Sequence, residues 1–293
     1  MSEHLREACV RADGARFLKA PGRVKLGKIH LGVPQFISAR PLVYGLMRVV
    51  DPRIVLNYNE PTILAEMLTR GEIDAALIPS IEFLRGAGHY LVNGPGLVAR
   101  PGHGSAVLIA SKPLCDLKRV AVSEHCRTPV ATLRIALSDL HGVLPDLLVE
   151  KHIDANWRKQ YDAVLLTSDC TLDQGICAPI DSDTTHDVAS MWAQIAAVPL
   201  VAAVWAYSSP ALATELEDLL ITSRNLGIQN LSRLADGISR TTHYDSEALY
   251  EYLSTAWSYQ IGETEAKGLR LFEKRALEFD LLRKGRLESV TAG

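Results

Sequence analysis

Ser38, Arg40 and Pro41 form a short polar segment between an apolar stretch and a helical pattern. Proline is favoured in the first turn of a helix, where its missing N–H breaks no hydrogen bond. The backbone N–H groups at such a helix start attract an anion, and an arginine guanidinium matches the geometry of a carboxylate. We therefore interpret the segment as a carboxylate-binding turn. An ordinary strand-to-helix loop with a serine cap explains the same residues equally well.

A second segment, Arg127-Thr128-Pro129, repeats this arrangement later in the chain. Threonine is a preferred N-cap and proline is favoured as the first helical residue, so we expect Thr128 to cap a helix that begins at Pro129. An arginine beside that helix start favours a second carboxylate site. A plain helix cap without a ligand is the alternative interpretation.

Hydroxyl and carboxylate side chains also follow two predicted strands. Ser80 comes after an apolar strand, where we expect it to cap a helix that carries Glu82 in its first turn. Ser168 and Asp169 come directly after another apolar strand. Ligands of open α/β sheets collect at the carboxyl ends of strands, so both are candidate binding residues, although such turns are also ordinary loop chemistry. Glu82 is the nearest candidate base, and stabilisation of its own helix is the simpler role.

Alternating strand and helix patterns must position these side chains. Short apolar runs predict strands, whereas apolar residues three and four apart predict helices. The N-terminal order of strand, helix, strand, helix is typical of a parallel sheet covered by helices. The predicted strands are 28–33, 54–58, 74–78, 105–111, 118–123, 161–166 and 200–207. We also expect helices after Pro41, from Pro61 to Gly71, after Thr128 and over 186–196, a loop over 94–104, and only helices after Pro210.

The composition and the motifs that are missing favour a large protein without a metal or cofactor. The chain has 293 residues, is 47% hydrophobic and carries a formal net charge of -3, which favours two domains and gives no general attraction to nucleic acid or acidic membranes. Five scattered cysteines favour reduced thiols. The sequence has no phosphate-binding glycine loop, zinc motif or nucleophile elbow. It also has no secretory pattern or membrane-spanning run, so we expect a cytoplasmic protein.

Several segments together resemble the chorismate dehydratases of the futalosine route to menaquinone. Residues 36–46 are similar to the family segment Tyr-Leu-Asn-x-x-Pro-Leu-x-Tyr-Gly-Leu, and 68–84 to the block that ends in Ser-Ile-Glu. The strand that starts at Ser105 and the helix start at Arg127 have counterparts too. Residues 259–272 resemble the family pattern Tyr-x-x-Gly-x-x-Glu-x-x-Gly-Leu-x-x-Phe. The likeness covers 28–282, and the order and spacing of its segments make it specific.

The resemblance implies an α/β, two-lobed fold like that of type II periplasmic binding proteins, with a cleft between the lobes and C-terminal helices. Lobe one would comprise 28–109 plus 201–293, and lobe two 110–200, after an N-terminal extension over 1–27. The site motifs would face each other across the cleft. Ser38 would take the catalytic position. The implied substrate-binding residues are Arg40, Ser80, Ser105, Arg127, Thr128, Ser168 and Asp169.

The implied activity is the conversion of chorismate to 3-[(1-carboxyvinyl)oxy]benzoate and water, without a cofactor. Three departures lie where ligand contacts are expected: Ser38 replaces an asparagine thought to sit at the reacting centre, Pro129 replaces a serine, and Ser168 replaces a glycine. Altered chemistry, altered substrate and lost activity therefore stay open. The alternative is a re-purposed protein of the same fold that binds a small aromatic or carboxylate ligand. The oligomeric state is open as well.

Overall fold

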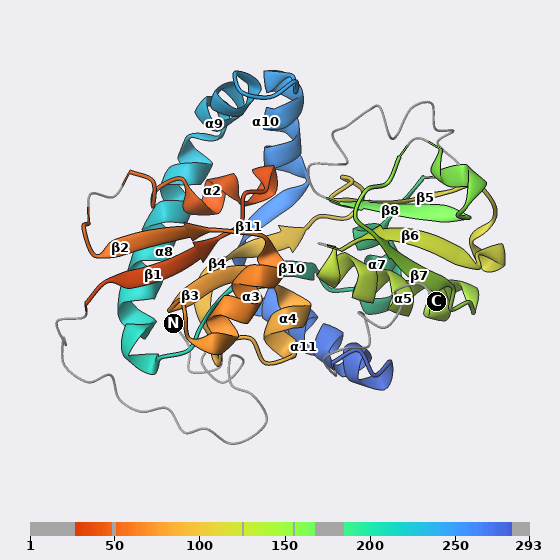
Figure 1. The fold of residues 1–293 in the computed structure, drawn as a ribbon, viewed down its shortest axis with the longest axis horizontal. Coiled ribbons are helices and arrows are strands. Elements are labelled where there is room, and N and C mark those ends of the chain that lie inside the picture. Colours follow the sequence, from red (N-terminus) through yellow and green to blue (C-terminus); the bar gives the residue numbers. More distant parts are fainter. Residues whose placement is uncertain (1–26, 49–50, 125, 155, 168–184, 283–293) are drawn as a thin grey trace.

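The computed structural model describes residues 27–48, 51–124, 126–154, 156–167 and 185–282. Two separate β-sheets, each accompanied by helices, lie side by side in this part of the chain (Figure 1). The first sheet has the strand order β11-β4-β10-β3-β1-β2, and the second has the order β7-β6-β8-β5-β9. The predicted α/β class is therefore confirmed. Residues 1–26 of the predicted N-terminal extension lie outside the described residues.

The first sheet combines a parallel N-terminal part with antiparallel strands from the rest of the chain. β1 (Ile29–Val33) pairs in parallel with β2 (Ile54–Tyr58) and β3 (Ala75–Pro79), as the alternating pattern predicts. β10 (Leu200–Tyr207) lies antiparallel between β3 and β4 (Tyr90–Ala99), and β11 (Trp257–Ile261) pairs with β4 at the edge. Chain that returns after residue 199 thus completes a sheet begun at residue 29.

The second sheet is built from the middle of the chain. β6 (Arg119–Ser123) lies parallel between β7 (Asp146–Glu150) and β8 (Ala163–Thr167). β5 (Ala106–Ala110) pairs antiparallel with β8 and with β9 (Thr185–Asp187). We propose that the two sheets are the cores of the two predicted lobes. The pairing of β5 assigns it to the second sheet, so the predicted boundary between 109 and 110 falls inside this strand, before its last residue.

Helices cover these sheets with their apolar faces. α3 (Pro61–Arg70) shows why: Leu64 and Leu68 are buried against the sheet, whereas Ile63 is exposed. The helix begins at proline and ends at Gly71 in the left-handed conformation, as predicted. The remaining helical segments are η1 (Ile37–Ala39), α2 (Arg40–Val43), α4 (Ser80–Leu84), η2 (Leu114–Asp116), α5 (Arg127–His141), η3 (Trp157–Lys159), α7 (Val188–Ala196), η6 (Pro210–Leu212), α8 (Ala213–Gln229), α9 (Leu231–Ser239), α10 (Ser246–Thr255) and α11 (Glu263–Glu278).

α11 packs against both halves of the molecule (Figure 1). Its Phe272 ring meets the Trp192 ring of α7 edge to face, with the ring centroids 5.7 Å apart. Arg275 Nη2 lies 2.6 Å from Asp139 Oδ1 of α5. The same helix contacts α4 and β10 on the first-sheet side. α11 is thus a brace between the two sheets.

Two predictions about the strands of the first sheet were wrong. The predicted loop over 94–104 is strand up to Ala99, because β4 continues through Gly94-Pro95-Gly96. A Cβ on Gly96 would lie 2.2 Å from Ile261 Cδ1, so glycine permits the close approach of β11, and the pairing is irregular beside the proline. The second error concerns the C-terminal part, which contains the strand β11 among its helices. No helix in the described ranges is both long and apolar enough to cross a membrane.

Candidate functional site

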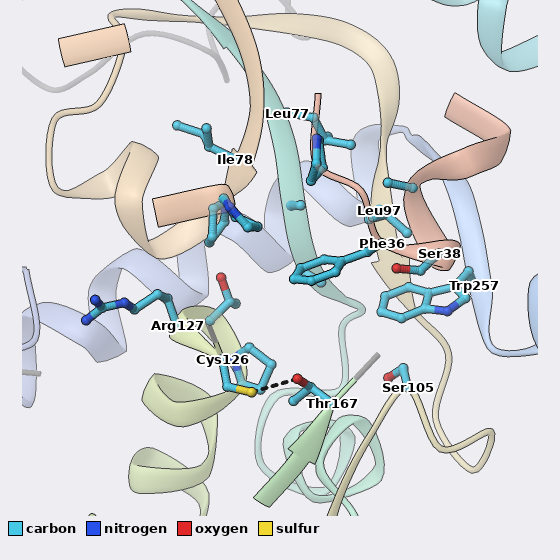
Figure 2. Close-up of a pocket in the computed structure, with 18 residues that line it drawn as sticks. Phe36, Ser38, Leu77, Ile78, Leu97, Ser105, Cys126, Arg127, Thr167 and Trp257 are labelled. Atoms are coloured by element: carbon cyan, nitrogen blue, oxygen red, sulfur yellow. Dashed lines mark hydrogen bonds between the residues drawn. The ribbon is translucent and has the colours of Figure 1, made fainter. Parts of the chain in front are cut away.

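A pocket opens between the two sheets and takes its walls from both (Figure 2). It encloses about 580 Å³ free of protein atoms, including the part that opens to solvent, which is within the usual range of small-molecule sites. The first-sheet side supplies Pro34, Phe36, Ser38, Ala39, Pro61, Leu77, Ile78, Pro79, Leu97, Ala202, Ala203 and Trp257. The second-sheet side supplies Ser105, Cys126, Arg127, Thr128, Pro129 and Thr167.

The two walls of this pocket differ in polarity. On the first-sheet side, Ser38 supplies the sole polar side chain among the residues that line the pocket, and the rest are aliphatic, aromatic or proline. The second-sheet side carries hydroxyl and thiol groups at the start of α5, and the guanidinium of Arg127 extends from this helix start away from Phe36 and Trp257 (Figure 2). A helix start and an arginine together create positive potential, so this wall suits the anionic end of a ligand. The opposite wall suits an apolar body.

Thr128 reaches the pocket, but not as a helix cap. α5 begins at Arg127, with Cys126 as the N-cap and no side-chain cap, so the predicted cap at Thr128 was wrong. Any position in the first turn of a helix tolerates proline, because the N–H groups of that turn have no partner within the helix. Pro129 can therefore be the third residue of α5, and the helix starts two residues earlier than expected. The buried Thr128 Oγ1 instead accepts a hydrogen bond from the backbone N–H of Ile81 in α4, at 3.3 Å. This bond connects the two walls directly.

Cys126 and Thr167 make a second polar contact in the same wall. Their Sγ and Oγ1 atoms are hydrogen-bonded at 2.6 Å, which joins the start of α5 to the carboxyl end of β8 (Figure 2). Both side chains lie in segments that the sequence marks as candidates, but neither was among the predicted site residues. A signal existed for Thr167, because it lies between the end of a predicted strand at 166 and the candidates Ser168 and Asp169. Those two candidates lie outside the described residues, so their role stays a prediction.

Of the first polar segment, the serine lines the pocket and the arginine does not. Ser38 lies in η1, is 2% exposed, and points its hydroxyl into the space beside Phe36 and Trp257 (Figure 2). Arg40 begins α2, is half-buried, and is absent from the pocket wall. The close packing of α2 fixes this turn, since a Cβ on Gly227 of α8 would lie 1.8 Å from the carbonyl oxygen of Pro41.

Ser80 and Glu82 have structural partners away from the pocket. Pro79 is the N-cap of α4, and the fully buried Ser80 Oγ donates to the carbonyl oxygen of Val201 at 2.7 Å. The predicted cap at Ser80 was therefore wrong, because its hydroxyl ties α4 to β10 instead. Glu82 Oε1 accepts from Arg85 Nη1 at 2.8 Å, and neither side chain lines the pocket. This ion pair agrees with the simpler helix-stabilising role.

Ser105 lies at the pocket, and Trp257 is a lining residue that sequence reasoning missed. Ser105 is 3% exposed and occupies the chain crossing between β4 and β5. Trp257 is 6% exposed and comes from β11. The latter was missed because its strand was expected to be helix. Among the described residues, no cluster of histidine, cysteine, aspartate and glutamate side chains is arranged to hold a metal ion.

Comparison with known sequences gives a consistent match over nearly the whole fold. Residues 29–278 match the model of a family described as menaquinone biosynthesis. The chain is 26% identical over 261 residues to a protein named chorismate dehydratase from Thermus thermophilus. That alignment covers 83% of this chain and 93% of the relative.

Comparison with solved structures identifies the architecture. A protein from Archaeoglobus fulgidus matches with a TM-score of 0.70 at 16% identity, over 87% of this chain and 98% of that one. The alkanesulfonate-binding protein of Xanthomonas axonopodis pv. citri, bound to MOPS, matches with a TM-score of 0.62 at 18% identity, over 92% and 99%. At this identity the likeness shows the fold alone. The chain has the predicted fold of the periplasmic binding proteins.

Proposed function

The chain belongs to the menaquinone biosynthesis family, and on that premise we propose that it is a carbon–oxygen lyase that dehydrates chorismate to 3-[(1-carboxyvinyl)oxy]benzoate. The chorismate dehydratase relative supports this reaction. The observation that carries the proposal is the pocket between the sheets, with one apolar wall and one positive wall at the start of α5. A cytoplasmic location, expected from the sequence, remains part of the proposal.

Substrate binding begins at the positive wall. Chorismate carries two carboxylates, one on its ring and one on its enolpyruvyl ether. One of them binds at the start of α5, where backbone N–H groups and Arg127 offer charge-assisted hydrogen bonds. The Thr128 hydroxyl lies in the same wall. The ring then extends toward the apolar first-sheet wall, away from water.

The reaction removes a proton and a hydroxyl group from neighbouring ring carbons. The proton leaves the carbon that bears the enolpyruvyl ether, the electron pair of that C–H bond forms the new ring double bond, and the adjacent C–O bond breaks to release the hydroxyl as water. The ring becomes aromatic, which supplies the driving force. The protein therefore needs to orient the dianion and exclude water more than to supply strong chemical groups.

Ser38 and a substrate carboxylate are assigned the two polar roles in this step. The Ser38 hydroxyl points into the pocket from the apolar wall, where it can donate to the leaving hydroxyl group. Among the described lining residues, Cys126 and Arg127 are the titratable ones. We therefore assign the proton to a carboxylate of the substrate itself, held within reach by its own geometry. Asp169, outside the described residues, is the second candidate.

A non-catalytic binding protein is the competing function, favoured by the fold. The alkanesulfonate-binding protein, which shares this architecture, is bound to the sulfonate MOPS. Ser38 in place of asparagine fits a site that retains binding and has lost turnover. This alternative predicts saturable binding of chorismate without product.

Incubation of the purified protein with chorismate, followed by chromatographic identification of products, tests the proposal. We expect 3-[(1-carboxyvinyl)oxy]benzoate to form. Arg127→Gln should raise KM about 10- to 100-fold, since it removes a charge-assisted hydrogen bond to a carboxylate. Arg70→Gln is the matched control, because Arg70 is an exposed residue of α3 outside the pocket. Saturable binding without product would replace the lyase with the binding protein.

A further inference from the structure

Trp257 is held rigidly at the apolar wall of the pocket. It begins β11, where it pairs with Ala99 of β4. The ring of Tyr252 in α10 meets the indole edge to face, at 6.3 Å between centroids and an angle of 87°. The strand pairing on one side and the tyrosine ring on the other restrain the indole at the pocket wall.

A second aromatic ring faces the same space. Phe36 lies between β1 and η1, is half-buried, and lines the pocket together with Trp257. In Figure 2 the six-membered ring of the indole is the part of Trp257 nearer to Phe36, and the indole nitrogen is on the far side. Trp257 therefore offers the pocket an aromatic surface and not a hydrogen-bond donor. Within the described chain no ring contact joins these two side chains, so neither ring uses the other as its packing partner.

We propose that Trp257 is a specificity-determining residue, which together with Phe36 binds the ring of the substrate and selects cyclic, conjugated carboxylates over saturated or acyclic ones. This inference rests on the proposed function for the identity of the ring. The carboxylate binds at the start of α5 on the opposite wall. One wall therefore recognises the carboxylate of the ligand, and the other recognises its ring. Aromatic rings prefer planar, unsaturated partners because of their quadrupole and their large contact area.

The same contact favours the reaction in its later stages. Chorismate has a puckered, non-aromatic ring, whereas the product ring is planar. A flat aromatic surface contacts a flat ring better than a puckered one, so the contact strengthens as the ring flattens. An interaction that grows toward the transition state raises kcat and not only affinity. Trp257 would thus act on both binding and rate.

Tryptophan fluorescence gives a direct test of position. Trp257 lines the pocket, whereas Trp157, Trp192 and Trp205 are buried elsewhere. We expect saturable quenching when 3-[(1-carboxyvinyl)oxy]benzoate is titrated into the native protein. Trp257→Phe should remove the quenching and keep the affinity within about twofold, because a ring remains. Trp205→Phe, a substitution in the core, should keep the quenching. Quenching that survives in Trp257→Phe would overturn the inference.

Ring selectivity tests the contact itself. Benzoate and cyclohexanecarboxylate have the same charge and nearly the same size, and differ in aromaticity. The native protein should bind benzoate more tightly by about 2- to 12-fold, and Trp257→Leu should abolish that preference. A merely structural tryptophan would weaken both ligands equally. Equal weakening, or an unchanged preference, would contradict the specificity role.

The two ligands also separate this inference from the function it builds on. Turnover of chorismate is measured independently, by chromatography. If chorismate gives no product but benzoate binds with quenching and selectivity that depend on Trp257, the lyase fails and the aromatic contact stands. If product forms and Trp257→Leu leaves both kcat and ring selectivity unchanged, the lyase stands and the aromatic contact fails.

Discussion

The Thr128 hydroxyl joins the two walls of the pocket, so its removal tests more than the stability of one helix. Thr128→Val keeps the size and removes the acceptor for the backbone N–H of Ile81. A buried donor without its partner costs about 1–3 kcal/mol of unfolding free energy. We also expect weaker ligand binding, because the contact between α4 and α5 is lost at the pocket. Thermal unfolding and calorimetric titration measure the two effects.

Thr132 provides the matched control on the same helix. Its buried Oγ1 donates to the carbonyl oxygen of Thr128, one turn away, and it does not line the pocket. Thr132→Val should lower stability and leave ligand affinity unchanged. Equal losses of affinity in both variants would mean that Thr128 acts through α5 alone.

Residue types were predictable at this scale, but their partners were not. Ser38, Arg127 and Thr128 were proposed from local pattern and Ser105 from the family resemblance, and all four line the pocket. Their hydrogen bonds were unpredictable, since Thr128 bonds to a helix 47 residues away in sequence. The same holds for Ser80, whose hydroxyl bonds to a strand 121 residues away. Helix capping is a local interaction, and in both residues a hydrogen bond to a distant part of the chain replaces it.

At the scale of elements, the packing of α11 against the segment before β10 depends on a glycine. A Cβ on Gly268 would lie 2.2 Å from the carbonyl oxygen of Pro199. Gly268→Ala should therefore push α11 away and cost about 1–3 kcal/mol of unfolding free energy, as overpacking does. The affinity for the ligand should fall too, because Pro199 directly precedes β10, whose Ala202 and Ala203 line the pocket. Denaturant unfolding and ligand titration check both.

Gly237 of α9 is the matched control, because a Cβ there would meet nothing within 4 Å. Gly237→Ala should raise stability by about 0.5–1 kcal/mol, the usual helix preference for alanine over glycine. If both variants shift stability in the same direction, close packing is not the reason for glycine at 268.

Most regular elements followed from periodicity, whereas four strands, β4, β7, β9 and β11, did not. β1, β2, β3 and α3 have the length and apolar spacing that define them. β4 contains a Gly-Pro-Gly sequence that indicates a loop, and its pairing with β10 and β11 overrides that local preference. β11 is a five-residue strand between helices, where no local pattern distinguishes it. The missed strand carried the missed lining residue, Trp257.

At the scale of the whole molecule, the folding stability depends on pH through His186, a partly buried histidine of the second sheet. Burial, and secondarily the positive charge of His141, lower the pKa of His186 below its ordinary 6.5. The folded state then binds fewer protons than the unfolded state in the interval just below pH 6.5. Stability from this group is complete above pH 6.5 and is lost as the pH falls through that interval.

Melting temperature measured across that interval checks the linkage. His186→Gln should flatten the pH dependence below 6.5. His141→Gln should flatten it less, since burial is the larger cause of the shift. A native melting temperature that rises on acidification through this interval would show the opposite sign and contradict the assignment.

The two-sheet arrangement was predictable in outline, and the brace between the sheets was not. Resemblance to a known family implied two lobes around a cleft. Three of the contacts that connect the two halves are long-range: Phe272 with Trp192, Arg275 with Asp139, and Ile81 with Thr128. The sequence of either segment in such a pair does not indicate which distant segment it contacts. Tertiary packing, and not local preference, sets the shape of the pocket.

Ser38 is the residue on which the proposed chemistry depends most. Asparagine offers two donors and an acceptor on a longer side chain, whereas serine offers one hydroxyl of shorter reach. In a buried site, one missing oriented hydrogen bond can cost roughly 10²–10³-fold in rate. Ser38 is 2% exposed, so this comparison applies to a water-poor environment. The native chain should therefore dehydrate chorismate slowly, and an asparagine should accelerate it.

The most direct measurement is the initial rate of chorismate loss, with product identified by chromatography, for the native protein, Ser38→Asn and Ser38→Ala at equal folded concentration. We predict slow turnover by the native protein, faster turnover by Ser38→Asn, by up to roughly 10²-fold, and slower turnover by Ser38→Ala. A fast native rate that asparagine reduces would contradict the assigned role of Ser38. No product from any of the three proteins would contradict the dehydratase itself.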